Sequence, residues 1–296
     1  MSRVTDVIGL LGELNNLKRV RVAGNSYSLA EQYFAKAWGA IVRGEDVSEV
    51  ALRTSAHFVA SSRLGGITGE VMAGAGLNSG EVTETLVRSL REASSGLDLS
   101  LRGDLEQQLA FALAEQPVPD FVGLLCNQPR AGATRPGEAR ILLLPAESHG
   151  DHCLTVAVYG VLLAPKFGAA IEMTFLAGLA HHLHNAYLPD SGFAGEEMLG
   201  SLLERVMVVF RLRAAEQLEP TLRDRVFRAL DTTGSAETAE GKAFHAADVI
   251  DRVLQMQWYE SSARFELRMA MEDMQLVHAG PVQQFHRTVL REAGLW

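Results

Sequence analysis

The stretch LAGLAHHLHNAYLPD (residues 176–190) places three histidines, His181, His182 and His184, at the end of an otherwise apolar helical pattern. An imidazole that is buried without hydrogen-bond partners costs roughly 1–3 kcal/mol. A divalent metal ion supplies those partners, because neutral imidazole is its commonest nitrogen ligand. The stretch therefore predicts one side of a metal site.

Two further segments supply ligands of the same kind. ESHGDHCL (147–154) brings His152 into the start of a helix, and EGKAFHAADVIDRV (240–253) carries Asp248 among small residues on another helix. A carboxylate offsets part of the charge of a metal ion. Three helices that meet at one cation would be clamped together by it.

These segments resemble the HD-domain superfamily, the metal-dependent phosphohydrolases defined by an H…HD…D pattern on a helical bundle. The likeness is to the 5′-deoxynucleotidase-type branch, with its E-S-x-x-E-H-S-L segment, its A-L-L-H-D-x-x-E-x-x-x-x-D segment and a closing A-D helix. It covers roughly residues 140 to 260. The resemblance implies one divalent ion (Mn, Co, Fe or Zn) held by His152, His181 and Asp248, with His182 at the fourth position.

The sequence departs from this family at two positions. His182 stands where the family has an aspartate, which removes one negative charge from the ligand set. Asn185 stands where the family has the glutamate that acts as general acid or base, and an amide cannot transfer a proton at a useful pH. Asp190 matches the family's substrate-orienting aspartate. His184 or Asp151 would have to replace the missing base.

The resemblance and its departures leave three functions open. The first is hydrolysis of a small phosphate ester, such as a nucleotide. The second is a catalytically degraded HD module with a binding, sensing or scaffold role. The third and most distant is an HD-type iron oxygenase, which usually holds two metals and needs further histidines before the last aspartate. His245 is the one histidine between His184 and Asp248 in the sequence.

Arginine is needed near such a site to hold a phosphate group. Arg130, Arg135 and Arg140 precede the first ligand helix, and the sequence does not single out one of them.

Other polar residues around the motifs have simpler interpretations. Glu147 is expected to be a helix-start carboxylate that meets the positive end of the helix dipole, or to hold His152 or a sugar. His149 is expected in a loop, and Asp251 is expected to pair with Arg252 or solvent. The remaining histidines of the second half are expected to be ordinary: His245, His278 and His286.

The composition bounds the partners and the location. The 296 residues are 47% hydrophobic and 21% charged, as in an ordinary globular protein. The net charge of −9 disfavours nucleic acid or an anionic membrane as the main partner, and a small phosphorylated molecule is the expected one. Two cysteines outside any CxxC pair, and the lack of a signal peptide or a long apolar run, predict a cytoplasmic protein.

Almost all the periodicity is helical, which predicts an all-α protein. The proline- and glycine-rich segment 116–145 predicts a boundary near residue 120. A smaller helical N-terminal domain (1–120), of unknown role, would then precede an HD-type helical domain (121–296). Within the boundary segment, 141–144 is consistent with a strand or a buried extended segment.

The helices expected in the second part are 151–164, 171–187, 196–218, 220–230, 240–260 and 261–278, with a last helix beginning at Pro281. An apolar stripe in 261–278 is typical of a core or of a dimer interface, which allows a homo-oligomer. Its members are Phe265, Leu267, Met269, Met271, Met274 and Leu276.

Overall fold

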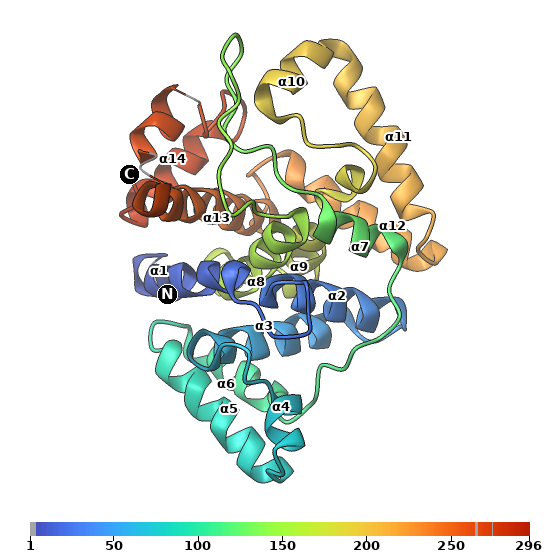
Figure 1. Cartoon of the computed structure of the whole chain (residues 1–296), viewed down its shortest axis with the longest axis vertical. Helices are drawn as coiled ribbons and strands as arrows, with labels where there is room; N and C mark the ends of the chain where they lie inside the picture. The colour runs from blue at the N-terminus through green and yellow to red at the C-terminus, as the bar shows by residue number, and fades with distance from the viewer. Residues whose placement is uncertain (1–3, 264–265, 274) are drawn as a thin grey trace.

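The computed structural model describes residues 4–263, 266–273 and 275–296. In these ranges the fold is all-α, as predicted, with isolated β-bridges and no strand (Figure 1). The helices of the first part are α1 (Val4–Asn15), α2 (Leu29–Val42), α3 (Val47–Leu64), α4 (Gly69–Gly74), α5 (Ser79–Ala93) and α6 (Leu99–Gln108). Those of the second part are α7 (Asp120–Asn127), α8 (His149–Phe167), α9 (Ile171–Ala180), α10 (Gly192–Leu199), α11 (Leu203–Ala215), α12 (Pro220–Asp231), α13 (Ala239–Ala263) and α14 (Gln283–Glu292). The short turns of helix are η1 (Asn16–Arg19), η2 (Leu183–Ala186), η3 (Gly200–Leu202), η4 (Thr232–Gly234) and the π-turn η5 (Met269–Asp273).

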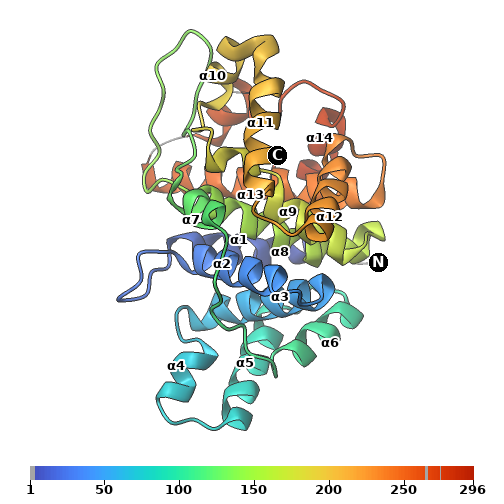
Figure 2. The ribbon, with the colours of Figure 1, turned by 90° about the vertical axis from the view of Figure 1, so that its right-hand side faces the viewer.

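Helix α8 is the central element of the fold. It packs against α9 and α13 on one side and against α2 and α3 on the other, while α5 and α6 lie farther out against α3 (Figures 1 and 2). Every residue from His149 to Ala164 is buried. A helix that is apolar and buried all round must have neighbours on every face. Residues at its start are therefore enclosed by several elements at once.

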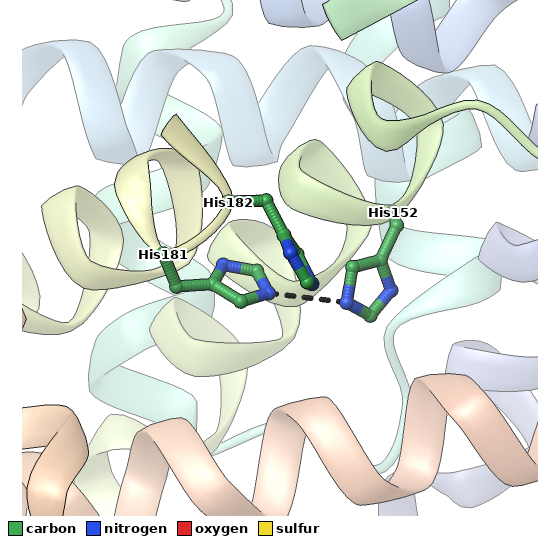
Figure 3. Close-up of side chains that lie close together, drawn as sticks. All are labelled: His152, His181 and His182. Carbon is green, nitrogen blue, oxygen red and sulfur yellow. Dashed lines mark hydrogen bonds between the residues drawn. The ribbon is translucent and has the colours of Figure 1, made fainter. Parts of the chain in front are cut away.

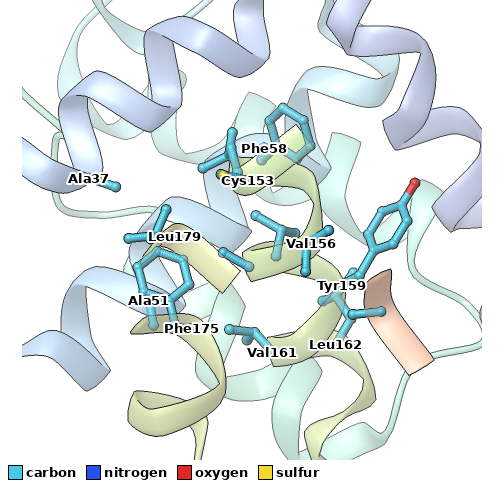
Figure 4. Close-up of a cluster of buried hydrophobic side chains, with 14 of the residues drawn as sticks. Ala37, Ala51, Phe58, Cys153, Val156, Tyr159, Val161, Leu162, Phe175 and Leu179 are labelled. Carbon is cyan, nitrogen blue, oxygen red and sulfur yellow. The ribbon is translucent and has the colours of Figure 1, made fainter. Parts of the chain in front are cut away.

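One hydrophobic cluster runs through both parts of the chain. Around α8 it joins Phe58 of α3, Val156 of α8 and Phe175 of α9 (Figure 4). The hydroxyl of Tyr159 on α8 donates to the carbonyl of Leu11 on α1. The boundary expected near residue 120 falls between α6 and α7, and the helices on both sides of it contribute to this one core.

The boundary segment differs from the expectation of a strand or a buried extended segment. Residue 141 forms a single bridge to Ala133, and the side chains of Leu142 and Leu144 are 74% and 70% exposed. Leu143 alone of these residues is buried and joins the small cluster around Tyr259. Residues 141–144 therefore form an extended segment in which Leu143 is buried and Leu142 and Leu144 are exposed, in place of the expected strand or fully buried segment.

Three expected helices end earlier or are divided. The helix expected over 171–187 ends at Ala180, and the one expected over 196–218 is interrupted at Gly200, whose φ of 50° ends α10. The helix expected over 261–278 is replaced by the end of α13 and the turn η5. Phe265 and Met274 of the apolar stripe lie outside the described residues. No helix in the described ranges is long and apolar enough to span a bilayer.

The contact between α8 and α9 depends on Gly178. A Cβ at this position would lie 2.4 Å from Cα of Ala157 and 2.6 Å from its backbone nitrogen. Backbone atoms cannot move aside as a flexible side chain does, so the two helices must separate. Only glycine permits the observed approach of the two helices.

We expect Gly178→Ala to lower the free energy of unfolding by about 1–3 kcal/mol, since overpacking a tight contact costs that much. At a size of about 300 residues this corresponds to a fall in melting temperature of roughly 2–12 °C, measured by calorimetry. Gly103→Ala is the matched control, because nothing lies within 4 Å of its added Cβ and alanine is favoured in a helix. Equal melting temperatures for the two variants would contradict this account of the α8–α9 contact.

Candidate metal centre

The start of α8 is fixed by a capping box. The Ser148 hydroxyl accepts a hydrogen bond from the backbone nitrogen of Asp151, and the Asp151 carboxylate accepts one from the backbone nitrogen of Ser148. The same carboxylate accepts from the hydroxyl of Ser28 on the N-terminal side. Burial, and then the nearby Glu31, raise the pKa of Asp151 to about 7. Asp151 is held by Ser148 and Ser28 and is not among the residues that line the cavity beside the histidines, so it is not placed to replace a missing base, which corrects that expectation. The capping box brings His152 into the first turn.

The end of α9 carries the two adjacent histidines. His181 is its C-cap, and His182 has φ −106° and ψ 20°, which leaves the α-helical region before η2 begins. This departure turns the ring of His182 toward that of His181, and their centroids lie 4.2 Å apart. In a continued helix these side chains would diverge, because successive residues point about 100° apart.

His152, His181 and His182 converge on one point (Figure 3). One ring nitrogen from each lies within 4.8 Å of the other two. Nε2 of His181 is 3.1 Å from Nε2 of His152. Sequence motifs that are far apart along the chain thus meet, as predicted.

The remaining ring nitrogen of each histidine is already used. Nδ1 of His152 donates to Oδ2 of Asp251 at 2.7 Å, and Nδ1 of His181 donates to the carbonyl of Gly178 at 2.8 Å. Nδ1 of His182 donates to Oδ1 of Asn185 at 2.8 Å. Since these partners accept, each neutral ring keeps its lone pair at Nε2. Such outer partners are what orient the histidine ligands of metal ions.

Asp248 on α13 adds a carboxylate to this group. Its Oδ1 lies 3.3 Å from Nε2 of His152, and its Oδ2 lies 3.5 Å from Nη1 of Arg252. Burial alone would raise the pKa of Asp248, but its neighbours His152 and Arg252 hold it well below the usual range. The carboxylate is therefore ionised and faces the histidines with a negative charge.

This donor set fits a cation. Two imidazole lone pairs 3.1 Å apart repel each other unless a proton or a metal ion lies between them. Burial, and then His152, lower the pKa of His181 to about 3, and burial with His181 lowers that of His182 well below normal. A shared proton can bridge only two nitrogens, whereas three nitrogens and a carboxylate meet here, which is the number of ligands that a metal ion can bind. The separation is close to the roughly 3.3 Å between nitrogens of a tetrahedral zinc site.

A second possible metal group, formed by Glu147, His152 and Asp251, is already filled by an ammonium. Nζ of Lys18 lies 2.5 Å from Oε1 of Glu147 and 2.6 Å and 2.8 Å from the two oxygens of Asp251. The Lys18 side chain is 1% exposed and that of Asp251 is fully buried. The expected pairing of Asp251 with Arg252 or solvent is therefore wrong, because Lys18, Asn15 and His152 surround it.

The network gives residues of the N-terminal part a place in the site. Lys18 holds Asp251, and Asp251 fixes the ring of His152. Lys18 is not among the residues that the sequence motifs indicate. One signal could have found it: Leu11, Leu14 and Lys18 follow helical spacing, so the lysine continues a buried stripe.

Asn185 holds the ring of His182 and is not placed as a proton carrier. Its Nδ2 donates to the carbonyl of Leu188 at 3.0 Å, which leaves Oδ1 to face Nδ1 of His182. Both ends of the amide are satisfied. Asn185 therefore fixes the orientation of His182.

We expect Asn185→Ala to weaken the binding of a divalent ion by about 10–100-fold, the usual cost of losing an outer partner of a histidine ligand. Titration calorimetry of the metal-free chain with Zn²⁺ or Mn²⁺ measures the change. Asn127→Ala is the control, since Asn127 is an exposed residue at the end of α7 whose side chain donates to the carbonyl of Gly123, away from the histidines. An unchanged affinity in Asn185→Ala would rule out its role as a support of His182.

Asp190 holds the loops around the site. Its Oδ2 accepts from the backbone nitrogen of Ala131 at 3.0 Å, and its Oδ1 accepts from that of Gly192 at 2.8 Å. His149 lies close by, with Nε2 3.6 Å from Asp190 and its ring 4.7 Å from that of His182. His149 is fully buried in the first turn of α8, so its expected loop position is wrong. Burial, and then Arg130, hold its pKa well below normal.

Arg130 is the arginine that reaches the histidines. Its Nη1 donates to Nε2 of His182 at 3.4 Å, a contact that an ion bound at this nitrogen would displace, and its Nε is 3.5 Å from Oε2 of Glu147. Burial alone would lower the pKa of Arg130, but Glu147 and other nearby carboxylates raise it. Arg140 binds the carbonyls of Ala131 and Ser191 instead. Arg135 pairs with Glu138, away from the cluster.

A cavity of about 610 Å³ opens beside the cluster and is lined by His181, His182 and Asp248. Arg130, Asp190 and His184 also line it. His184 is 6% exposed. Burial, and then the charge of Arg211, lower its pKa to about 4.

The histidines expected to be ordinary, His245, His278 and His286, also line this cavity. Nε2 of His286 is 3.3 Å from Nδ1 of His245.

No protein-family model, no curated protein and no solved structure matches this chain.

Proposed function

We propose that this chain is a metal-dependent phosphohydrolase that acts on a small phosphate ester, such as a nucleotide. One divalent ion (Mn, Co, Fe or Zn) would be held by His152, His181, His182 and Asp248. The observation that carries the proposal is the convergence of three Nε2 lone pairs, each fixed by a different Nδ1 partner, beside an ionised carboxylate. When bound, the ion would lower the pKa of a water molecule and polarise a phosphoryl oxygen.

The chain's own residues would bind and orient the ester. Arg130 presents its guanidinium beside His182, where it can donate a hydrogen bond to a phosphate oxygen. Asp190 fixes the backbone directly after Arg130 and so positions that side chain. A cavity of about 610 Å³ lies within the range of about 300–1,000 Å³ typical of small-molecule sites.

The proposal does not need a glutamate at position 185. An ion held by three neutral histidines and one carboxylate keeps more positive charge than one held by two of each, and this favours ionisation of a bound water. Asn185 then contributes by holding His182. The proposal also places the protein in the reducing cytoplasm, where the buried, unpaired Cys126 and Cys153 would remain thiols.

The test is to measure the metal content of the purified chain and then the release of phosphate from a panel of nucleotides and sugar phosphates. Mn²⁺, Co²⁺, Fe²⁺ and Zn²⁺ are supplied in turn. We expect about one ion per chain, and turnover that stops with EDTA and returns with one of the metals. Absence of bound metal under all four conditions would overturn the proposal.

A second candidate is a catalytically degraded HD module that binds its ligand without turning it over. Asn185 favours it, because the amide replaces the family's general acid or base and both its ends are occupied. Bound metal with no release of phosphate from any ester would favour this candidate. Consumption of oxygen by the iron-loaded chain would favour the more distant oxygenase.

A further inference from the structure

A positive side chain without an acidic partner lines the cavity beside the histidine cluster. Arg211 on α11 is half-buried, and within the part of the chain that the structure describes its Nε is buried without a hydrogen-bond partner. Burial is the cause that lowers the pKa of Arg211, and no carboxylate contributes to offset it. A partly desolvated cation of this kind is costly unless an anion accompanies it.

The other two arginines of the cavity each lie beside a carboxylate. Arg130 lies beside Glu147, and Arg252 lies beside Asp248 and donates to the carbonyl of Leu276. Among the described residues of the cavity wall, Arg211 is the arginine for which no ion pair is found.

His184 supplies a second unused polar group next to Arg211. Helix α11 packs against η2, which contains His184. Nδ1 of His184 is buried and has no hydrogen-bond partner among the described residues. Its ring centroid is 5.7 Å from that of His182, so this corner of the cavity adjoins the cluster.

We propose that Arg211 and His184 bind a second anionic group of the substrate, while the reacting phosphate lies at His152, His181 and His182. The substrate class is then a small molecule with two anionic groups a few ångströms apart, either two phosphates or a phosphate and a carboxylate. The inference rests on the proposed function for the place of the reacting group. In it, His184 donates a hydrogen bond to the anion and does not take a proton from water.

Non-hydrolysable ligands test this without turnover. Methylenediphosphonate, phosphonoacetate and methylphosphonate are titrated by calorimetry into the full chain with Zn²⁺ or Mn²⁺ bound. Because a diphosphonate can also chelate the ion, the preference that counts is the part that depends on Arg211. We expect methylenediphosphonate or phosphonoacetate, which each carry two anionic groups, to bind about tenfold or more tightly than methylphosphonate, which carries one. A charge-assisted hydrogen bond to the second group is worth that factor. The one that binds more tightly identifies the second group. No preference for either over methylphosphonate would overturn the inference.

Arg211→Gln should reduce this preference to less than about twofold and leave methylphosphonate binding unchanged, because one charged group is lost. Arg205→Gln is the control, since this substitution removes the same charge from an exposed position on α11. Arg211→Lys, which keeps the charge, should retain part of the preference if Arg211→Gln folds poorly. Equal loss for all three ligands, or no loss, would contradict the assignment.

The outcome is separable from that of the proposed function. An Arg211-dependent preference with no phosphate released from any ester supports the second anion site and rejects hydrolysis. Phosphate release that Arg211→Gln leaves unchanged supports hydrolysis and rejects the second anion site.

Discussion

Replacing His152 by Gln is expected to remove the divalent ion from the protein. His152 is the residue that touches both His181 and Asp248, and its other nitrogen is held by Asp251. Glutamine cannot present an aromatic nitrogen at the same point. We expect the affinity for Zn²⁺ or Mn²⁺ to fall by more than about 100-fold, the upper end of the cost of losing only an outer partner.

Metal content after dialysis, measured by mass spectrometry, should fall from one ion per chain to essentially none, and any phosphate release should fall with it. His57→Gln is the matched control. His57 is also a buried helical histidine, but its Nε2 pairs with the carbonyl of Phe111 at 2.9 Å, in the N-terminal part of the chain. Full retention of metal by His152→Gln would show that the histidines do not share an ion.

Replacing Lys18 by Met is expected to give the largest loss of stability. The change leaves Glu147 and Asp251 facing each other in a buried site without the ammonium that now separates them. Breaking a buried ion pair by removing one partner costs about 3–5 kcal/mol. In a chain of this size the melting temperature should fall by roughly 6–20 °C. Lys36→Met is the control, because Lys36 pairs with the exposed Glu70, and surface pairs contribute about 0–1 kcal/mol.

The loss should depend on pH in a defined direction. Burial alone would raise the pKa of Asp251, but Lys18 and His152 lower it below normal in the folded wild type. A lowered folded pKa stabilises the protein above the unfolded value, about 4, and this contribution is lost as pH falls through the folded value. Without Lys18 the Asp251 carboxylate takes up a proton more readily. The deficit of Lys18→Met should therefore be greatest near pH 7 and shrink as the pH approaches 4.

The double variant Lys18→Met/Glu147→Gln separates the charge from the shape of the side chain. It removes one of the two carboxylates and leaves Asp251 on His152. We expect it to recover a large share of the lost stability, measured by thermal unfolding. A double variant as unstable as Lys18→Met alone would contradict the electrostatic explanation.

The sequence predicted the helices and the meeting of the histidines for separate reasons. Helical periodicity identified the helices, and the motifs around His152, His181 and Asp248 indicated which helices approach one another. Periodicity is a property of consecutive residues. It can therefore assign α8 and α13 but cannot show how their polar side chains are paired.

The residues that were missed or misplaced depend on contacts between distant parts of the chain. Asp251 is bound by Lys18, which lies 233 positions away, and no local pattern links the two. His149 has the sequence setting of an exposed helix start, yet the loops held by Asp190 cover it. The sequence indicated Asn185 only as the replacement of a catalytic residue. Its hydrogen bond to His182 depends on the turn that ends α9 at Ala180.

X-ray absorption spectroscopy of the zinc-loaded chain tests the central claim most directly, because it reports which atoms surround the ion. The account predicts three imidazole nitrogens at about 2.0–2.1 Å with oxygen completing the shell, and one fewer nitrogen in His181→Ala. A shell of oxygen alone, or a spectrum that His181→Ala leaves unchanged, would contradict it.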